Sequence, residues 1–181
     1  MNPIVAGLLA WLLLGLQLGL AETLRLGEAG LTPDLLLVLM AFVALHAPSR
    51  VAGWTALALG GITDMTWAVP LDDGGSASML GPHMLGYVLA SQAIVALRAN
   101  LIRRNPLTLG AVTLLAGLIS GAVVVAIVTF RDAYDPLAWR AGAELLTRLG
   151  SAGYSGVAAV ILAFALLPLT PVMGFGPTRR N

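Results

Sequence analysis

Three ionisable side chains, Asp34, Asp64 and His83, interrupt otherwise apolar stretches of this sequence. An ionisable group at membrane depth costs roughly 2.5–3.5 kcal/mol even on lenient insertion scales, so it is seldom left facing lipid. Each of the three is therefore expected to face protein, water or a partner. Two carboxylates can in principle serve as the acid and base of a hydrolase, so these residues are the first candidates for function.

The composition is that of a membrane protein. Apolar residues make up 58% of the 181 residues and charged residues 10%, whereas soluble proteins average about 25% charged residues. This length predicts a single transmembrane domain over residues 1–181. The sequence has no cysteine, which excludes disulfides, thiolate metal sites and cysteine nucleophiles. Two histidines are too few for a histidine metal site, and we expect no cofactor and no nucleic-acid partner.

The apolar residues gather in stretches of about the 20 residues that a transmembrane helix needs. They cover about residues 4–21, 31–47, 51–67, 79–97, 107–130 and 149–169. The sequence thus predicts an all-α, polytopic bundle of six transmembrane helices. The first stretch follows Met1-Asn2-Pro3, which lacks the basic residue of a signal peptide, so we expect this helix to be retained.

The arginines orient this bundle. With six spans, both termini share one side with the second and fourth loops, and the charges on that side are all arginines: Arg50, Arg98, Arg103, Arg104, Arg179 and Arg180. The other side mixes four arginines with seven acids: Arg25, Arg131, Arg140, Arg148, Glu22, Glu28, Asp72, Asp73, Asp132, Asp135 and Glu144. The positive-inside rule places the first side, and both termini, in the cytoplasm.

The loop that carries Arg98, Arg103 and Arg104 has two interpretations. These arginines fix the topology of the chain, or they contact anionic lipid headgroups or a cytoplasmic partner.

Three connecting segments have a distinctive composition. Residues 71–78 are polar and rich in Gly and Ser, which predicts a flexible loop. Asp135-Pro136 is typical of a helix start, and the apolar spacing after it predicts a short helix on the outer surface, with Trp139 at headgroup level. Residues 170–181 are rich in proline and are expected to form an irregular cytoplasmic tail.

In this topology Asp34, Asp64 and His83 all lie at the outer ends of their helices, so they are expected to converge. His83 and Tyr87 lie four residues apart and form a polar stripe that should face the interior of the bundle. Glycines at helical spacing let another helix approach closely. The residues expected to serve helix packing are Gly60, Gly61, Gly86, Gly117 and Gly121, and the pair Gly15 and Gly19 also fits this pattern.

Simpler roles remain open for each polar residue. Asp34 follows Pro33 at a helix start, where a carboxylate caps the helix and meets the positive end of its dipole. Asp64 lies close enough to the membrane surface to be merely solvated. His83 follows Pro82 and could be a first-turn interface residue.

The sequence lacks the common signatures of enzymes. It has no zincin pair, no serine in a nucleophile elbow and no phosphate-binding loop. Polar residues that would hold a sugar around Asp34 and Asp64 are also lacking, so a membrane hydrolase is the weakest hypothesis. We expect a protein that is not an enzyme.

Four short segments appear in an order that resembles the family of the rod shape-determining protein MreD. They are Pro33-Asp34 with its leucine-rich run, His46-Ala47-Pro48, Gly60-Gly61-Ile62-Thr63-Asp64, and Leu80-Gly81 through Gly86-Tyr87. The resemblance covers roughly residues 31–104. The chain length, the six predicted spans and the arginine-rich fourth loop also agree with this family.

The resemblance implies a non-enzymatic scaffold subunit in the bacterial inner membrane. Members of this family bind MreC and connect indirectly to the RodA polymerase, a class B penicillin-binding transpeptidase and MreB, which together maintain cell shape through peptidoglycan synthesis. In this hypothesis, the polar cluster of Asp34, Asp64, His83 and Tyr87 holds a partner helix or the loops of the bundle.

A second hypothesis comes from the fold. The MreD family resembles the substrate-binding subunits of energy-coupling-factor transporters, which take vitamin-like ligands in an outer pocket. The aromatic residues placed to line such a pocket are few: Trp67, Tyr87, Trp139 and Tyr154.

Overall fold

The computed structural model describes residues 2–27, 30–71, 74–135 and 137–175. Within these ranges the chain is mainly helical, which confirms the all-α prediction. The helices are α1 (Pro3–Gly19), α2 (Leu35–His46), α3 (Ser49–Thr66), α4 (Pro82–Leu97), α5 (Pro106–Asp132) and α6 (Ala141–Leu166). The short elements are the strands β1 (Ala68–Pro70) and β2 (Ser76–Ser78) and the 3₁₀ turns η1 (Arg98–Asn100) and η2 (Leu167–Leu169).

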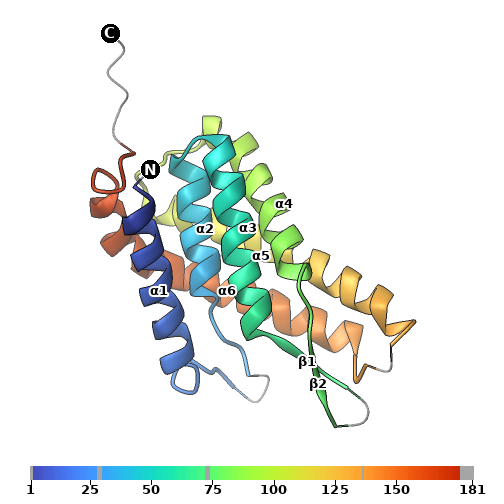
Figure 1. The fold of residues 1–181 in the computed structure, drawn as a ribbon. Helices are drawn as coiled ribbons and strands as arrows, with labels where there is room; N and C mark the ends of the chain where they lie inside the picture. Colours follow the sequence, from blue (N-terminus) through green and yellow to red (C-terminus); the bar gives the residue numbers. More distant parts are fainter. Residues whose placement is uncertain (1, 28–29, 72–73, 136, 176–181) are drawn as a thin grey trace.

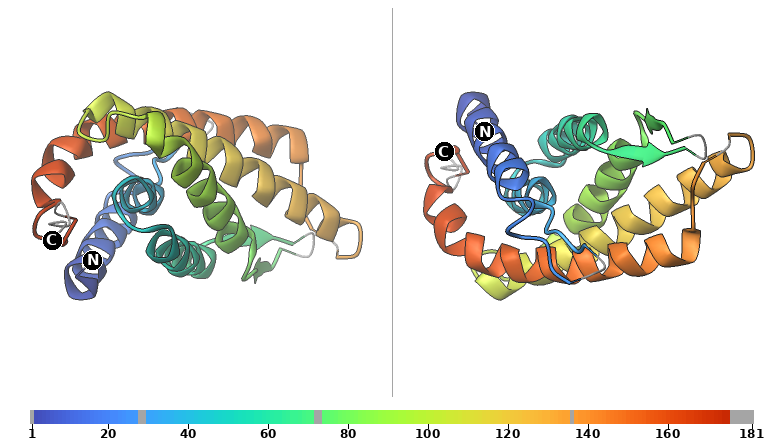
Figure 2. Two further views of the ribbon diagram at one scale, coloured as in Figure 1. Left: turned by 90° about the horizontal axis from the view of Figure 1, so that it is seen from above. Right: turned by 90° about the horizontal axis from the view of Figure 1, so that it is seen from below.

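Figure 1 shows α1 to α4 standing side by side, with α5 and α6 behind them. In Figure 2, α2 and α3 are seen nearly end-on while α5 and α6 extend across the view, so the long pair crosses α2 and α3 steeply. The described part of the chain begins and ends at one end of the bundle, where the Asn2 main-chain N–H donates to the Met173 carbonyl at 2.9 Å. We call this the arginine end, and the opposite end, which carries the β1–β2 hairpin, the hairpin end.

Helix α2 forms the centre of the bundle. Every residue from Leu35 to Leu45 is buried, with at most 4% of its surface exposed, and α2 contacts each of the other five α-helices. A helix that is apolar on all sides buries its side chains only when other elements surround it. The unbroken leucine-rich run after Asp34 therefore makes α2 the core around which the other helices pack.

Within the described residues, two helices, α5 and α6, are long and apolar enough to cross a membrane, as judged by length and composition. Helices α1 and α2 are apolar but shorter, at 17 and 12 residues. Length and composition therefore support two of the six predicted transmembrane helices and do not support the other four. The outer surface carries large apolar side chains such as Trp11 (79% exposed) and Phe164 (71% exposed). Soluble monomers rarely expose contiguous apolar patches larger than a few hundred Å², and this exterior fits a membrane protein.

The predicted flexible loop at residues 71–78 is wrong for the part that the structure describes. Strands β1 and β2 pair there in antiparallel register, with Val69 opposite Ala77, while Asp72 and Asp73 lie outside the described residues. The hairpin gains a further partner because Leu71 forms a β-bridge with Leu137.

That bridge also explains why the predicted surface helix after Asp135 is wrong. Residues 138–140 are not helical, and the Ala138 N–H donates to the Pro70 carbonyl at 3.1 Å. The Asp135 side chain pairs with Arg131 at 2.5 Å, and Pro136 lies outside the described residues. A single long helix, α6, instead begins at Ala141.

The described part of the predicted tail is folded into turns. Main-chain hydrogen bonds join Phe175 to Thr170 at 3.1 Å and Met173 to Leu169 at 2.9 Å. Met173 is completely buried. Residues 176–181, the remainder of the predicted tail, lie outside the described residues.

Candidate functional site

Asp64 supplies the N-terminal cap that α4 lacks. The N-cap residue of α4 is Gly81, which has no side chain to accept a hydrogen bond. The Asp64 carboxylate accepts the main-chain N–H groups of Gly81 at 2.8 Å, His83 at 2.9 Å and Met84 at 3.2 Å. Since the first N–H groups of a helix have no partner within it, a carboxylate at this position satisfies them and meets the positive end of the dipole.

Gly60 makes this cap possible. It lies one turn before Asp64 in α3, and a Cβ atom added there would stand 2.6 Å from the Met84 Cα and 2.7 Å from the His83 carbonyl oxygen. Only glycine therefore allows the first turn of α4 to come close enough for Asp64 to reach it. Gly81 itself has a φ of 129°, which favours glycine because other residues rarely adopt such a conformation.

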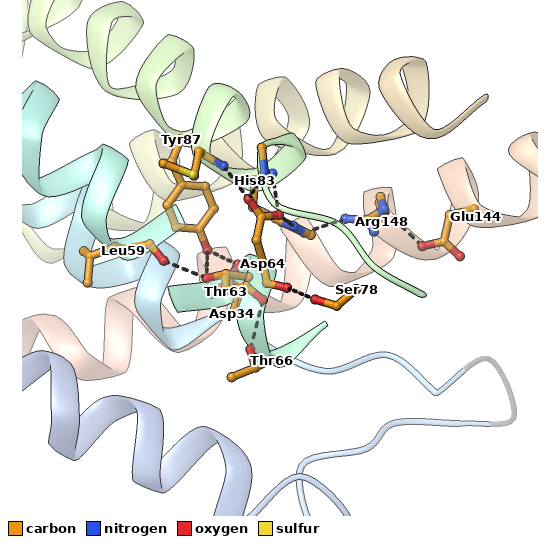
Figure 3. Close-up of polar contacts among 12 residues, drawn as sticks. Asp34, Leu59, Thr63, Asp64, Thr66, Ser78, His83, Tyr87, Glu144 and Arg148 are labelled. Atoms are coloured by element: carbon orange, nitrogen blue, oxygen red, sulfur yellow. Dashed lines mark hydrogen bonds and ion pairs between the residues drawn. The ribbon is translucent and has the colours of Figure 1, made fainter. Parts of the chain in front are cut away.

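The His83 ring lies between the Asp64 carboxylate and Arg148 of α6 (Figure 3). Its Nδ1 lies 2.8 Å from the Asp64 carboxylate, and the Arg148 guanidinium lies 3.2 Å from its Nε2. Arg148 can only donate, so Nε2 must accept and the ring proton belongs on Nδ1, where it is donated to Asp64. The order of donation is thus Arg148 to His83 to Asp64.

Arg148 is held on two further sides. Its Nε forms an ion pair with Glu144 at 3.0 Å, with an alignment too poor for a hydrogen bond. Its guanidinium carbon lies 4.9 Å from the centre of the Trp67 ring, which is a cation–π contact. The Trp67 and His83 rings meet edge to face with centroids 5.0 Å apart.

Asp34 organises the beginning of α2 in the same manner. One carboxylate oxygen accepts the Leu37 N–H at 3.0 Å, and the other accepts the Tyr87 hydroxyl in a short hydrogen bond. The Asp34 N–H donates to the Ser155 hydroxyl of α6 at 2.8 Å, and the Leu35 N–H donates to the Gln17 side chain of α1 at 2.8 Å. The first turn of α2 is therefore fixed by α1, α4 and α6 together.

The structure thus brings the predicted cluster of Asp34, Asp64, His83 and Tyr87 together at the hairpin end. Asp64 and Tyr87 are completely buried and His83 is 5% exposed. The Thr63 hydroxyl lies between the two halves, 3.4 Å from the Tyr87 hydroxyl, and donates to the Leu59 carbonyl at 3.0 Å. From here on, the polar cluster means the four predicted residues together with Thr63, Arg148 and Ser155.

A cavity of about 340 Å³ adjoins the polar cluster. Asp34, His83, Glu144 and Arg148 contribute to its wall, together with Trp67. Asp64 has no exposed surface, and both of its oxygens are occupied by α4. A hydrolase would need both carboxylates to reach one substrate, so this geometry gives that hypothesis no support.

The other predicted residues lie elsewhere in the bundle. Gly86 and Gly117 sit at close helix contacts, where an added Cβ would meet Ser120 of α5 and Ala152 of α6, each at 2.7 Å. Gly121 faces the Arg148 side chain, where an added Cβ would lie 3.3 Å from the Arg148 Cβ and require a small shift, and Gly61 faces the flexible Met84 side chain at 3.6–3.8 Å.

The pair Gly15 and Gly19 has nothing within 4 Å of an added Cβ, so the predicted packing at this pair is wrong within this chain.

The three arginines of the fourth loop lie at the arginine end, away from the polar cluster. The Arg98 guanidinium donates to the Ala44 carbonyl at 3.2 Å and, in a short hydrogen bond, to the Ala47 carbonyl. These are among the last carbonyls of α2, so Arg98 closes this helix from outside. Arg103 and Arg104 are exposed.

Sequence reasoning missed Arg148 and Ser155. It began the sixth span at residue 149, which left Arg148 among the loop charges. The signal was present, since Glu144, Arg148, Ser151 and Ser155 follow one another at spacings of four, three and four residues on one helix face. Gly110 and Gly156, which lie at a close contact between α5 and α6, were also missed.

Among the residues that the structure describes, no three His, Asp or Glu side chains are placed together to hold a metal ion. The arrangement can orient helices and bind polar groups, and its donors and acceptors are largely occupied by one another. No family model, curated protein or solved structure matches this chain.

Proposed function

We propose that this protein is a non-enzymatic scaffold of the bacterial inner membrane that acts in cell elongation, as the resemblance to MreD implies. In this role it binds MreC and links the RodA polymerase and a class B penicillin-binding transpeptidase to MreB. The observation that supports the proposal best is the structural role of Asp34 and Asp64, the two aspartates in the segments that resemble MreD. Asp34 and Asp64 each fix the beginning of a helix, and their carboxylate oxygens are occupied within the fold, which supports a structural use of both residues.

We infer that all six helices lie in the membrane with both termini in the cytoplasm. Helix α5, at 27 residues, is about 40 Å long, which exceeds the roughly 30 Å hydrocarbon core and allows it to tilt. Helix α2, at 12 residues, is only about 18 Å long. Its neighbours enclose it, so its short length leaves no polar main chain facing lipid.

Purification of the tagged protein from native membranes in mild detergent, followed by mass spectrometry, tests the proposal. We expect recovery of MreC together with the cell-wall synthases. Failure to recover MreC, with the protein folded and abundant, would contradict the scaffold role. Asp64→Ala is a poor probe of the interface, because loss of the α4 cap would disturb the protein itself.

Exposed positions on different faces give a sharper test of the partner surface. A photo-crosslinking residue at Trp11 of α1, Trp54 of α3 or Phe164 of α6 changes little inside the protein, since all three are at least 66% exposed. MreC should crosslink to one face and not to the others. Equal, weak crosslinking at all three positions would indicate random encounters in the membrane.

The cavity beside the polar cluster favours a second candidate, a substrate-binding subunit of an energy-coupling-factor transporter. Its volume of about 340 Å³ falls within the usual range for ligand pockets. Four ionisable residues contribute to its wall, whereas only Trp67 of the four expected aromatic residues does. Ligand pockets are usually lined by hydrophobic and aromatic side chains with only a few polar groups. Recovery of an ATPase pair with a transmembrane coupling subunit would support this candidate over the scaffold.

A further inference from the structure

Among the described residues, the arginine end carries positive charge without carboxylate counter-ions. Within the described residues, every aspartate and glutamate lies between 22 and 34, at 64, or between 132 and 144, all at the hairpin end. The ion pairs of the described chain are likewise at the hairpin end. Arg103 and Arg104, adjacent in the loop before α5, therefore lack a carboxylate partner in this part of the chain.

A pocket of about 590 Å³ lies beside these two arginines. Its wall combines Arg103 and Arg104 with His46 at the end of α2, and with Leu167, Thr170 and Phe175 of the C-terminal turns. Three segments far apart in sequence thus meet around one space. The pocket has charged donors on one part of its wall and apolar side chains on another.

The pocket is built from fixed parts. The C-terminal turns are held by the hydrogen bond from Asn2 to Met173 and by the burial of Met173. The His46 ring stacks against Phe175, with centroids 6.0 Å apart and planes inclined by 26°. Its Nδ1 donates to the Phe42 carbonyl at 2.9 Å, which fixes the ring orientation.

The second ring nitrogen of His46 is buried. Nε2 is shielded from solvent and lies near the Arg103 main chain without a hydrogen bond of normal geometry. The His46 ring therefore shapes one side of the pocket wall, and the polar contacts to a ligand come from the two guanidinium groups.

From these observations we propose that the pocket binds the phosphate group of an anionic membrane phospholipid. Arginine binds phosphate strongly because its planar fork donates two parallel hydrogen bonds. The Leu167 and Phe175 side chains suit the glycerol and the first carbons of the acyl chains. Only the membrane location is shared with the proposed function, since the site does not require MreC or any synthase.

The test is lipid binding by the purified full chain, measured by native mass spectrometry in detergent. Wild type should bind phosphatidylglycerol at least tenfold more tightly than zwitterionic phosphatidylcholine. The double variant Arg103→Gln/Arg104→Gln should lose that preference and still fold, because both side chains are exposed. Arg50→Gln is the matched control, since Arg50 lies at the same end and is not part of the pocket wall.

Four outcomes would overturn the proposal. Equal binding of the two lipids would mean that only the apolar surface of the protein holds them. A preference that survives in the double arginine variant would mean that Arg103 and Arg104 do not cause it. A preference that disappears equally in Arg50→Gln would mean that net charge and not this pocket is responsible. Inorganic phosphate that binds as tightly as phosphatidylglycerol would show that the acyl portion is not recognised and that the source is free phosphate.

Discussion

The two neighbouring glycines of α3 should respond to the same substitution in opposite ways. In Gly60→Ala the new methyl group would stand 2.6–2.8 Å from main-chain atoms of His83 and Met84, so α4 must move away by about 1 Å to restore ordinary contact. In Gly61→Ala the nearest atoms are those of the flexible Met84 side chain, at 3.6–3.8 Å. Alanine fits there without any movement.

The magnitudes follow from this geometry. Overpacking of a tight contact costs about 1–3 kcal/mol, and moving α4 also lengthens the hydrogen bonds to Asp64, which as bonds to a charged group are worth about 1.5–3 kcal/mol each. The gain in helix propensity offsets about 1 kcal/mol. We expect Gly60→Ala to lower the free energy of unfolding by about 2–4 kcal/mol, whereas Gly61→Ala should leave it unchanged or raise it by up to about 1 kcal/mol.

Thermal unfolding in one detergent, followed by tryptophan fluorescence, measures the difference. At about 2–4 °C per kcal/mol for a chain of this size, Gly60→Ala should lower the midpoint by roughly 4–16 °C and Gly61→Ala should not lower it. Equal midpoints for the two variants would refute the close approach of α3 and α4 and, with it, the explanation of the Asp64 cap.

Three further predictions concern the residues that fix helix ends. Asp64→Asn places an amide N–H₂ among N–H donors and should destabilise the protein by about 1–3 kcal/mol, whereas Asp135→Asn, in an exposed ion pair, should change stability by less than about 1 kcal/mol; thermal unfolding of both variants compares them. Tyr87→Phe removes the hydrogen bond to Asp34 and the longer contact with Thr63 and should cost about 1–3 kcal/mol; in a double-mutant cycle with Asp34→Asn, additive losses would show that Tyr87 and Asp34 do not interact. Arg98→Gln should speed amide hydrogen exchange in the last turn of α2, residues 42–47, and Arg50→Gln should not; unchanged exchange in Arg98→Gln would mean that this helix end is held without Arg98.

The sequence was sufficient to predict the helices because their apolar stretches are long and bounded by Pro, Gly or Asn. It also predicted that Asp34, Asp64, His83 and Tyr87 meet, since topology alone puts their helix ends together. Their partners could not be predicted in this way. That Asp64 serves α4 and not α3 depends on how closely two helices approach, and this distance is set by packing at Gly60.

The hairpin and the start of α6 were missed for a related reason. Short strands have little periodicity of their own, and the pairing of Leu71 with Leu137 joins positions 66 residues apart. Asp135-Pro136 carries a local helix-start signal, but Asp135 is engaged with Arg131. Local propensity is a weak guide where such distant contacts decide the structure.

The partners at the beginning of α2 also determine when this helix can be completed during synthesis. Asp34 is joined to Ser155, which lies 121 residues later in the chain. At the usual 5–20 residues per second, the ribosome needs roughly 6–24 s to make this interval. The central helix must therefore wait, with a main-chain donor unpaired, until the last helix arrives. A chain that stalls before α6 would leave this core helix unfinished and exposed to quality-control proteases.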